Sequence, residues 1–178
     1  MRHIRIALAL AAGLAAFPAH AADLATIECV IGNLRPALTN LIEADIARNL
    51  AESGKRPTYD PAIGSGLRIA AAACATEHKW SEAAVTAARV YTLAKLGWPI
   101  AQRVVTEKGF DPAALEDRFQ TLPEEARNRP LTAAEAQGLV IASVPDEAQQ
   151  TKENAELLNE FFLFASTIQF AAFDFSQA

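Results

Sequence analysis

The sequence contains little histidine and little cysteine, and this scarcity limits the chemistry that the protein can perform. Three histidines and two cysteines occur among its 178 residues. His3 and His20 lie in a segment that we expect to be removed, so His78 is the single histidine beyond it. A zinc site would have to use His78 with carboxylates only, and a catalytic serine would have to use His78 as its base. We therefore expect neither a metal nor another cofactor.

Several catalytic and cofactor motifs are missing as well. The sequence has no C-x-x-C-H for covalent haem, no G-x-S-x-G and no G-x-x-x-x-G-K-[ST] phosphate loop. The segment IGSGL, residues 63–67, is too short for a dinucleotide loop and follows no strand pattern. Alternating runs of β-branched residues, which are typical of strands, are also absent. The absence of strand patterns favours an all-α fold.

The first 22 residues have the pattern of a secretory signal peptide. Arg2 and Arg5 give a positively charged start, residues 6–17 form an uninterrupted apolar run, and Ala19-His20-Ala21 offers a small-x-small cleavage site. The apolar run is shorter than the ~20 residues that a membrane span requires. The pattern therefore predicts export to an oxidising compartment, the bacterial periplasm, with residues 1–22 removed.

The chain that remains after cleavage is acidic. We expect it to begin at Ala22 or Asp23, and the loss of Arg2 and Arg5 leaves 14 basic residues against 21 acidic ones, a net charge of −7. Such a charge repels nucleic acid and anionic lipid, so we predict no nucleic-acid partner. Residues 23–178 are long enough to bury a core, and we predict a single α-helical domain without a membrane span.

Signals for the start of a helix recur along the chain. Asp60-Pro61 and Asp111-Pro112 each place a capping acid before a proline in the first turn. Thr132-Ala133-Ala134-Glu135 has the pattern of a capping box, and Gly97 and Gly109 are predicted to end helices. These signals predict helices over residues 24–52 with a bend near Pro36, 61–79, 81–96, 99–108, 112–121, 123–128, 133–142 and 145–174.

The helix predicted over residues 145–174 is the most apolar. Its apolar face covers about half of the helix circumference, which is wider than the apolar stripe of a surface helix. We therefore predict that this helix runs through the core. That face consists of Leu157, Leu158, Phe161, Phe162, Phe164, Ala165, Ile168, Ala172 and Phe173. Leu163 and Phe170 fall on the polar side and form a small apolar ridge. Either another helix of the chain covers this ridge or a partner protein binds to it.

The stretch AAACATEHKW, residues 71–80, brings a cysteine, a glutamate and a histidine close together. Two cysteines in an exported chain indicate a disulfide. Cys29 and Cys74 each have small neighbours along their helical face, which permits the Cα separation of ~4.4–6.8 Å that a disulfide needs. We predict a Cys29–Cys74 bridge, which removes both sulfurs as nucleophiles or metal ligands. His78 is expected in the last turn of its helix, near the negative end.

The segment LAESGKRPTYDPAIGSGL, residues 50–67, superficially resembles the glutamate–serine motif of lytic transglycosylases. The resemblance implies a helical fold, peptidoglycan as substrate, and Glu52 as the catalytic acid with Ser53 beside it. The Gly-Leu-Met-Gln segment that follows in that family is missing here, and so is a counterpart of its later tyrosine motif. Positive side chains near Glu52 also favour the ionised carboxylate, whereas a catalytic acid must keep its proton.

Three classes of function remain open, and the sequence favours binding over catalysis. Small exported helical proteins without titratable clusters are typical of inhibitors, immunity proteins, adaptors and chaperone-like binders, here with an envelope protein as partner. One alternative is a peptidoglycan-cleaving lyase or hydrolase centred on Glu52. The other is a carrier of a small apolar ligand, with a cavity lined by Phe161, Phe164 and Phe170.

Overall fold

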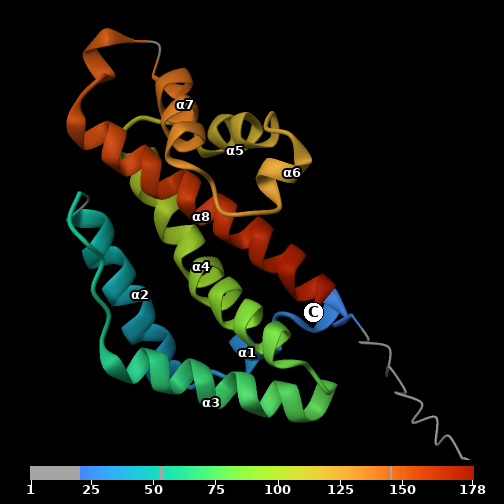
Figure 1. Ribbon diagram of the computed structural model, residues 1–178. Helices are drawn as coiled ribbons and strands as arrows, with labels where there is room; N and C mark the ends of the chain where they lie inside the picture. Colours follow the sequence, from blue (N-terminus) through green and yellow to red (C-terminus); the bar gives the residue numbers. More distant parts are fainter. Residues whose placement is uncertain (1–20, 53, 145) are drawn as a thin grey trace, which may run out of the picture.

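The computed structural model describes residues 21–52, 54–144 and 146–178, and within these residues every regular element is helical (Figure 1). The predicted all-α fold is confirmed. Residues 1–20 of the predicted signal peptide lie outside the described residues. The elements in chain order are η1 (Leu24–Thr26), α1 (Cys29–Gly32), α2 (Pro36–Ala51), α3 (Pro61–His78), α4 (Glu82–Glu107), α5 (Pro112–Gln120), α6 (Glu124–Arg127), α7 (Ala133–Ser143), η2 (Glu147–Gln149) and α8 (Lys152–Gln177).

Helices α4 and α8 form the centre of the molecule. Figure 1 shows them side by side and running in opposite directions, with α2 and α3 toward one end and α5, α6 and α7 toward the other. Leu158, Phe161 and Phe162 of α8 are fully buried, and so are Ala88 and Ala101 of α4. The prediction that the apolar C-terminal helix lies in the core is therefore confirmed. None of the helices in the described part of the chain is both long and apolar enough to cross a membrane.

The helix starts marked by Asp60, Asp111 and Thr132 are present. The side chain of Asp60 accepts a hydrogen bond from the backbone N–H of Ala62 at 2.7 Å. Asp111 caps α5 in the same way. At α7 the Thr132 hydroxyl accepts from the N–H of Glu135, and the Glu135 carboxylate accepts from the N–H of Thr132, which completes the capping box. Each cap satisfies backbone donors that the first turn leaves unpaired.

The prediction of one continuous helix over residues 24–52 is wrong. The structure divides it into η1, α1 and α2 rather than bending it at Pro36. Arg35 is extended, with φ −71° and ψ 141°, because the ring of the following proline disfavours the helical conformation in the residue before it. The interruption lets α1 pack against α3 while α2 packs against α4.

The predicted helices 81–96 and 99–108 are one continuous helix, α4, so Gly97 does not end a helix. Pro99 lies inside α4 and forgoes one backbone hydrogen bond to the carbonyl of Lys95. Gly97 instead allows close packing. A β-carbon added there would lie 2.9 Å from Cζ of Phe164, nearer still to Cε1 of that ring, and 3.1 Å from Cδ1 of Ile46. Gly109, with φ +85°, does follow the end of α4 as predicted.

We expect Gly97→Ala to lower the free energy of unfolding by about 1–2 kcal/mol, because the new methyl group must displace Phe164 and Ile46. In an open helical position the same change stabilises a protein by up to about 1 kcal/mol. Gly138 of α7 is such a position, since nothing lies within 4 Å of a β-carbon built there. Urea unfolding of Gly97→Ala and Gly138→Ala should give opposite signs. Equal signs would contradict the close packing at Gly97.

Helix α8 begins at Lys152, capped by the hydroxyl of Thr151, rather than at the predicted Pro145, which lies outside the described residues. The predicted apolar face is also rotated slightly. Phe173, which we expected in the core, is 39 % exposed, whereas Ser166, which we expected on the polar side, is 1 % exposed. Phe175 is fully buried as well. The covered face of α8 is decided by the helices around it.

Candidate functional site

The predicted disulfide is present and joins α1 to α3. The Cα atoms of Cys29 and Cys74 are 6.0 Å apart, and Cys74 is fully buried. The side-chain amide of Asn33 donates to both sulfurs at 3.3 Å. The bridge holds α1 against α3. Helix α1 has only four residues and therefore few side chains of its own with which to pack.

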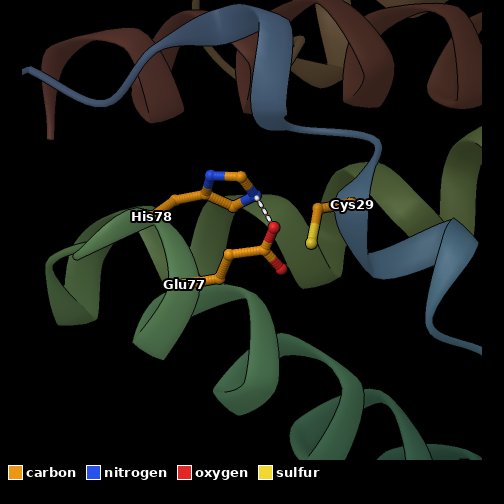
Figure 2. Close-up of side chains that lie close together, drawn as sticks. All are labelled: Cys29, Glu77 and His78. Carbon is orange, nitrogen blue, oxygen red and sulfur yellow. Dashed lines mark ion pairs between the residues drawn. The ribbon is translucent and has the colours of Figure 1, made fainter.

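Cys29, Glu77 and His78 lie together beside the disulfide and point toward one another (Figure 2). Their potential ligand atoms are within 4.8 Å of one another, and Nε2 of His78 lies 3.8 Å from Oε1 of Glu77. Cys29, however, is bonded to Cys74 and has no thiolate to offer. Only one imidazole and one carboxylate then remain in this cluster, fewer than the three or four protein ligands of a zinc site.

The rest of this stretch has a packing role. The indole N–H of Trp80 donates to the hydroxyl of Thr26 at 3.1 Å. The ring of Trp80 stacks on His78 at 5.7 Å and meets the ring of Phe175 edge-on at 5.0 Å. His78 lies in the last turn of α3, as predicted. Residues 71–80 therefore join η1, α3 and the C-terminal end of α8.

Glu52 is located on the surface at the end of α2. Its side chain is 52 % exposed and forms an ion pair with Lys55 at 3.2 Å. Arg48, four residues before Glu52 in the sequence, binds Asp45 at 2.8 Å and the carbonyl of Thr58 rather than Glu52. Ser53 lies outside the described residues. A glycan-cleaving acid needs an apolar enclosure to keep its proton, and the exposed side chain of Glu52 has none.

An apolar groove lies between α4 and α8. It consists of two hollows that share Val90, one of about 530 Å³ near the start of α4 and one of about 210 Å³ near Tyr59. We call this surface the α4–α8 groove. It is lined by Glu82, Ala83, Thr86, Ala87, Val90, Leu93 and Ala94 of α4, by Glu160, Leu163, Phe164, Thr167, Phe170, Ala171 and Asp174 of α8, and by Tyr59.

The α4–α8 groove contains both residues of the predicted ridge, in different settings. Leu163 is 38 % exposed, while Phe170 is half-buried and packs against the core. The exposure of Leu163 is matched by Val90 and Tyr59, which are 37 % and 39 % exposed. Small side chains of α4, such as Ala83 and Ala87, lie opposite Phe170 and leave the groove open. The ridge is thus one side of a longer apolar strip.

Comparisons with protein-family models, with curated proteins and with solved structures return no match. The function is therefore argued from the surface of this chain.

Glu160 is the charged residue at the Tyr59 end of the groove. Its side chain is half-buried, and among the described residues no hydrogen bond or ion pair reaches its carboxylate. Burial raises the pKa of Glu160 above its usual range, because desolvation disfavours the ionised form. Burial also raises the pKa of Tyr59. The approach of a cation stabilises the ionised form of a carboxylate in this setting.

Another hollow, of about 340 Å³, lies between α7 and the start of α8. Val140, Ile141 and Val144 supply its apolar lining. The polar groups around it are already paired within the chain: the Gln150 amide donates to the carbonyl of Val144 at 3.1 Å, and the Asn154 amide donates to that of Gln149 at 2.8 Å. These pairs leave fewer polar groups to orient a ligand than the α4–α8 groove, which has an unpaired carboxylate.

The helical pattern of the sequence indicated Leu163 and Phe170 but not Val90, Tyr59 or Glu160. Val90 precedes buried Tyr91 in α4, and the sequence around it does not indicate that its side chain is exposed. A signal was available in the spacing of Glu160, Leu163, Thr167, Phe170 and Asp174, which alternates between three and four residues. That spacing marks one continuous face of a helix. It becomes informative once α4 is known to lie beside α8.

Proposed function

We propose that this chain is an exported, non-enzymatic helical protein that binds a protein partner through the α4–α8 groove. The observation that supports this most strongly is the contiguous exposure of Tyr59, Val90 and Leu163 along the groove, next to half-buried Phe170. Single exposed apolar residues are ordinary, whereas contiguous strips of them mark interaction sites. An adaptor, inhibitor, immunity or chaperone-like role is consistent with such a surface.

The two alternative functions have less support. The surface position of Glu52 and its ion pair with Lys55 do not favour glycan cleavage. A carrier would need an enclosed cavity, but Phe161 is fully buried against Trp98, with ring centroids 4.8 Å apart, while Phe164 and Phe170 line different hollows of an open groove. An open groove suits a macromolecular partner better than a small apolar ligand.

Export is the second part of the proposal, with an envelope protein as the partner. It rests on the signal pattern of residues 1–22. The Cys29–Cys74 disulfide agrees with an oxidising compartment, where such bridges persist. Detection of the uncleaved chain in the cytoplasm of the native host would contradict this part without affecting the binding surface.

Site-specific photo-crosslinking tests the binding surface directly. A benzophenone amino acid at Val90 or Leu163, introduced in the native host, should give the same discrete protein adduct after illumination. The matched control is Ile69 of α3, a large apolar residue that is 70 % exposed outside the groove and should not give this adduct. Identical adducts from all three positions, or none from the groove, would contradict the proposal.

The substitution Leu163→Gln should reduce the adduct formed from Val90 about tenfold, because an amide buried without a hydrogen-bond partner at an apolar contact costs about 1–3 kcal/mol. The melting temperature should change by less than about 2 °C, since the side chain is 38 % exposed in the free protein. A loss of folding in this variant would place Leu163 in the core, and the interface would then need another centre.

A further inference from the structure

The α4–α8 groove has the shape and length of a binding site for one more helix. Its α8 side presents Glu160, Leu163, Thr167, Phe170 and Asp174, with the alternating spacing that forms the seam of helix-to-helix packing. Glu160 and Asp174 are about 21 Å apart along the helix axis, at ~1.5 Å per residue. An occupant of about four helical turns would therefore cover the groove from end to end.

The charges of the groove are all of one sign. Among the described residues that line it, Glu160 marks one end, Glu82 and Asp174 mark the other, and no lysine or arginine is present. Arg89 precedes Val90 in α4, but it is half-buried and does not belong to the lining. Acidic ends with an apolar middle complement a segment with the opposite charge at its ends.

Groove-to-groove pairing of two copies of the chain is disfavoured by charge. If two copies paired groove to groove, Glu82, Glu160 and Asp174 of one copy would face the acidic lining of the other. Like charges brought together in this way oppose association. A symmetric dimer through the groove is therefore disfavoured, and a different protein with basic side chains suits this surface better.

Building on the proposed function, we propose that the partner binds as an amphipathic α-helix of about four turns, with an apolar stripe against Val90, Leu163 and Phe170 and basic side chains at both ends. One basic side chain pairs with Glu160, and the other pairs with Glu82 and Asp174. Helix-in-groove recognition of this kind reads apolar residues at i, i+3 or i+4, and i+7.

Glu160 is the most discriminating residue in this arrangement. In the free protein its carboxylate is partly desolvated and no described residue pairs with it, so Glu160→Gln should leave the melting temperature unchanged or higher. In the complex the same change removes the partner of a basic side chain. A residue that served only stability would not show this separation between stability and binding.

Three synthetic peptides of 18 residues test the inference by fluorescence anisotropy at about 0.15 M salt. The first is a leucine–lysine amphipathic helix, the second replaces each lysine with glutamate, and the third scrambles the leucines of the first so that no stripe forms. The first should bind the exported protein at least tenfold more tightly than either control. Glu160→Gln should weaken its binding about tenfold, whereas Glu153→Gln, an exposed acidic change elsewhere on α8, should not.

The outcomes separate this inference from the proposed function. If the glutamate peptide binds as well as the lysine peptide, or if no peptide binds while Val90 still crosslinks to a protein, the partner chemistry is wrong and the groove remains the binding surface. If the lysine peptide binds equally to Leu163→Gln, it binds outside the groove and the inference falls. Self-association that Leu163→Gln abolishes would make the occupant a second copy and overturn the inference as well.

Discussion

Phe161→Ala is expected to reduce the free energy of unfolding by about 4 kcal/mol. Phe161 is fully buried in the middle of α8, where its ring lies 4.8 Å from that of Trp98 in α4 and 5.8 Å from that of Phe162. Truncation removes the transfer free energy of the ring and leaves a cavity between the two central helices. The surrounding side chains can only partly close such a cavity, because they belong to long rigid helices.

Urea unfolding monitored by tryptophan fluorescence measures this loss, and the same helix provides a control. Phe173 is the same residue type in α8 but is 39 % exposed. Phe173→Ala should cost only about 1–2 kcal/mol, because 39 % of the residue is already exposed to water and its removal leaves no enclosed cavity. Similar losses for the two variants would show that the α4–α8 interface is not the centre of stability.

Removal of the disulfide is the second large effect that we expect. The bridge spans a sequence separation of 45 residues, and in the chain-entropy model it stabilises the native state by about 4 kcal/mol. The double substitution Cys29→Ala and Cys74→Ala should therefore lower the melting temperature by about 10 °C. The loss should be large because α1 has only four residues and would not remain docked on α3 by itself.

Two controls distinguish the bridge from its surroundings. Reduction of the unsubstituted protein should lower the melting temperature by a similar amount without changing any side chain. His78→Gln, in the last turn of α3, should cost at most about 1 kcal/mol if the histidine acts at the helix end. A double cysteine variant that melts within about 2 °C of the parent would mean that Trp80 and its contacts suffice to hold the N-terminal segment.

The parts of the fold that were predicted correctly depend on local interactions. Asp60, Asp111 and Thr132 cap helices because each side chain reaches backbone N–H groups two or three residues ahead. Such a bond can be inferred from sequence alone, since both partners lie in one short segment. The Cys29–Cys74 bridge could also be predicted from the sequence, because two cysteines allow one intramolecular pairing.

The parts that were missed depend on neighbours that are remote in sequence. Gly97 and Pro99 have the local properties of a helix end, yet α4 continues through both. Gly97 accommodates the ring of Phe164 from α8 and the side chain of Ile46 from α2. Packing of this kind overrides the low helix propensity of glycine and proline. Local signals gave no information about it.

The candidate site shows the same division between local and remote information. The sequence separated Leu163 and Phe170 from the large apolar face of α8, but it did not identify the helix that lies beside them. Exposed Val90 and half-buried Glu160 line one groove because α4 lies antiparallel to α8. A helical pattern gives the faces of one helix, whereas a groove is a property of two.

The pairing of α4 with α8 also has a consequence for the order in which the protein folds. α4 ends at Glu107 and α8 begins at Lys152, so the main interface joins segments that are made at different times during synthesis. Until α8 has emerged, the side of α4 that packs against α8 stays exposed and is free to associate with other chains. Helices α5, α6 and α7 can form locally in the interval, but the core must wait for α8. Folding is therefore expected to be completed after translation, and a chain interrupted before Lys152 should aggregate rather than accumulate as a folded fragment.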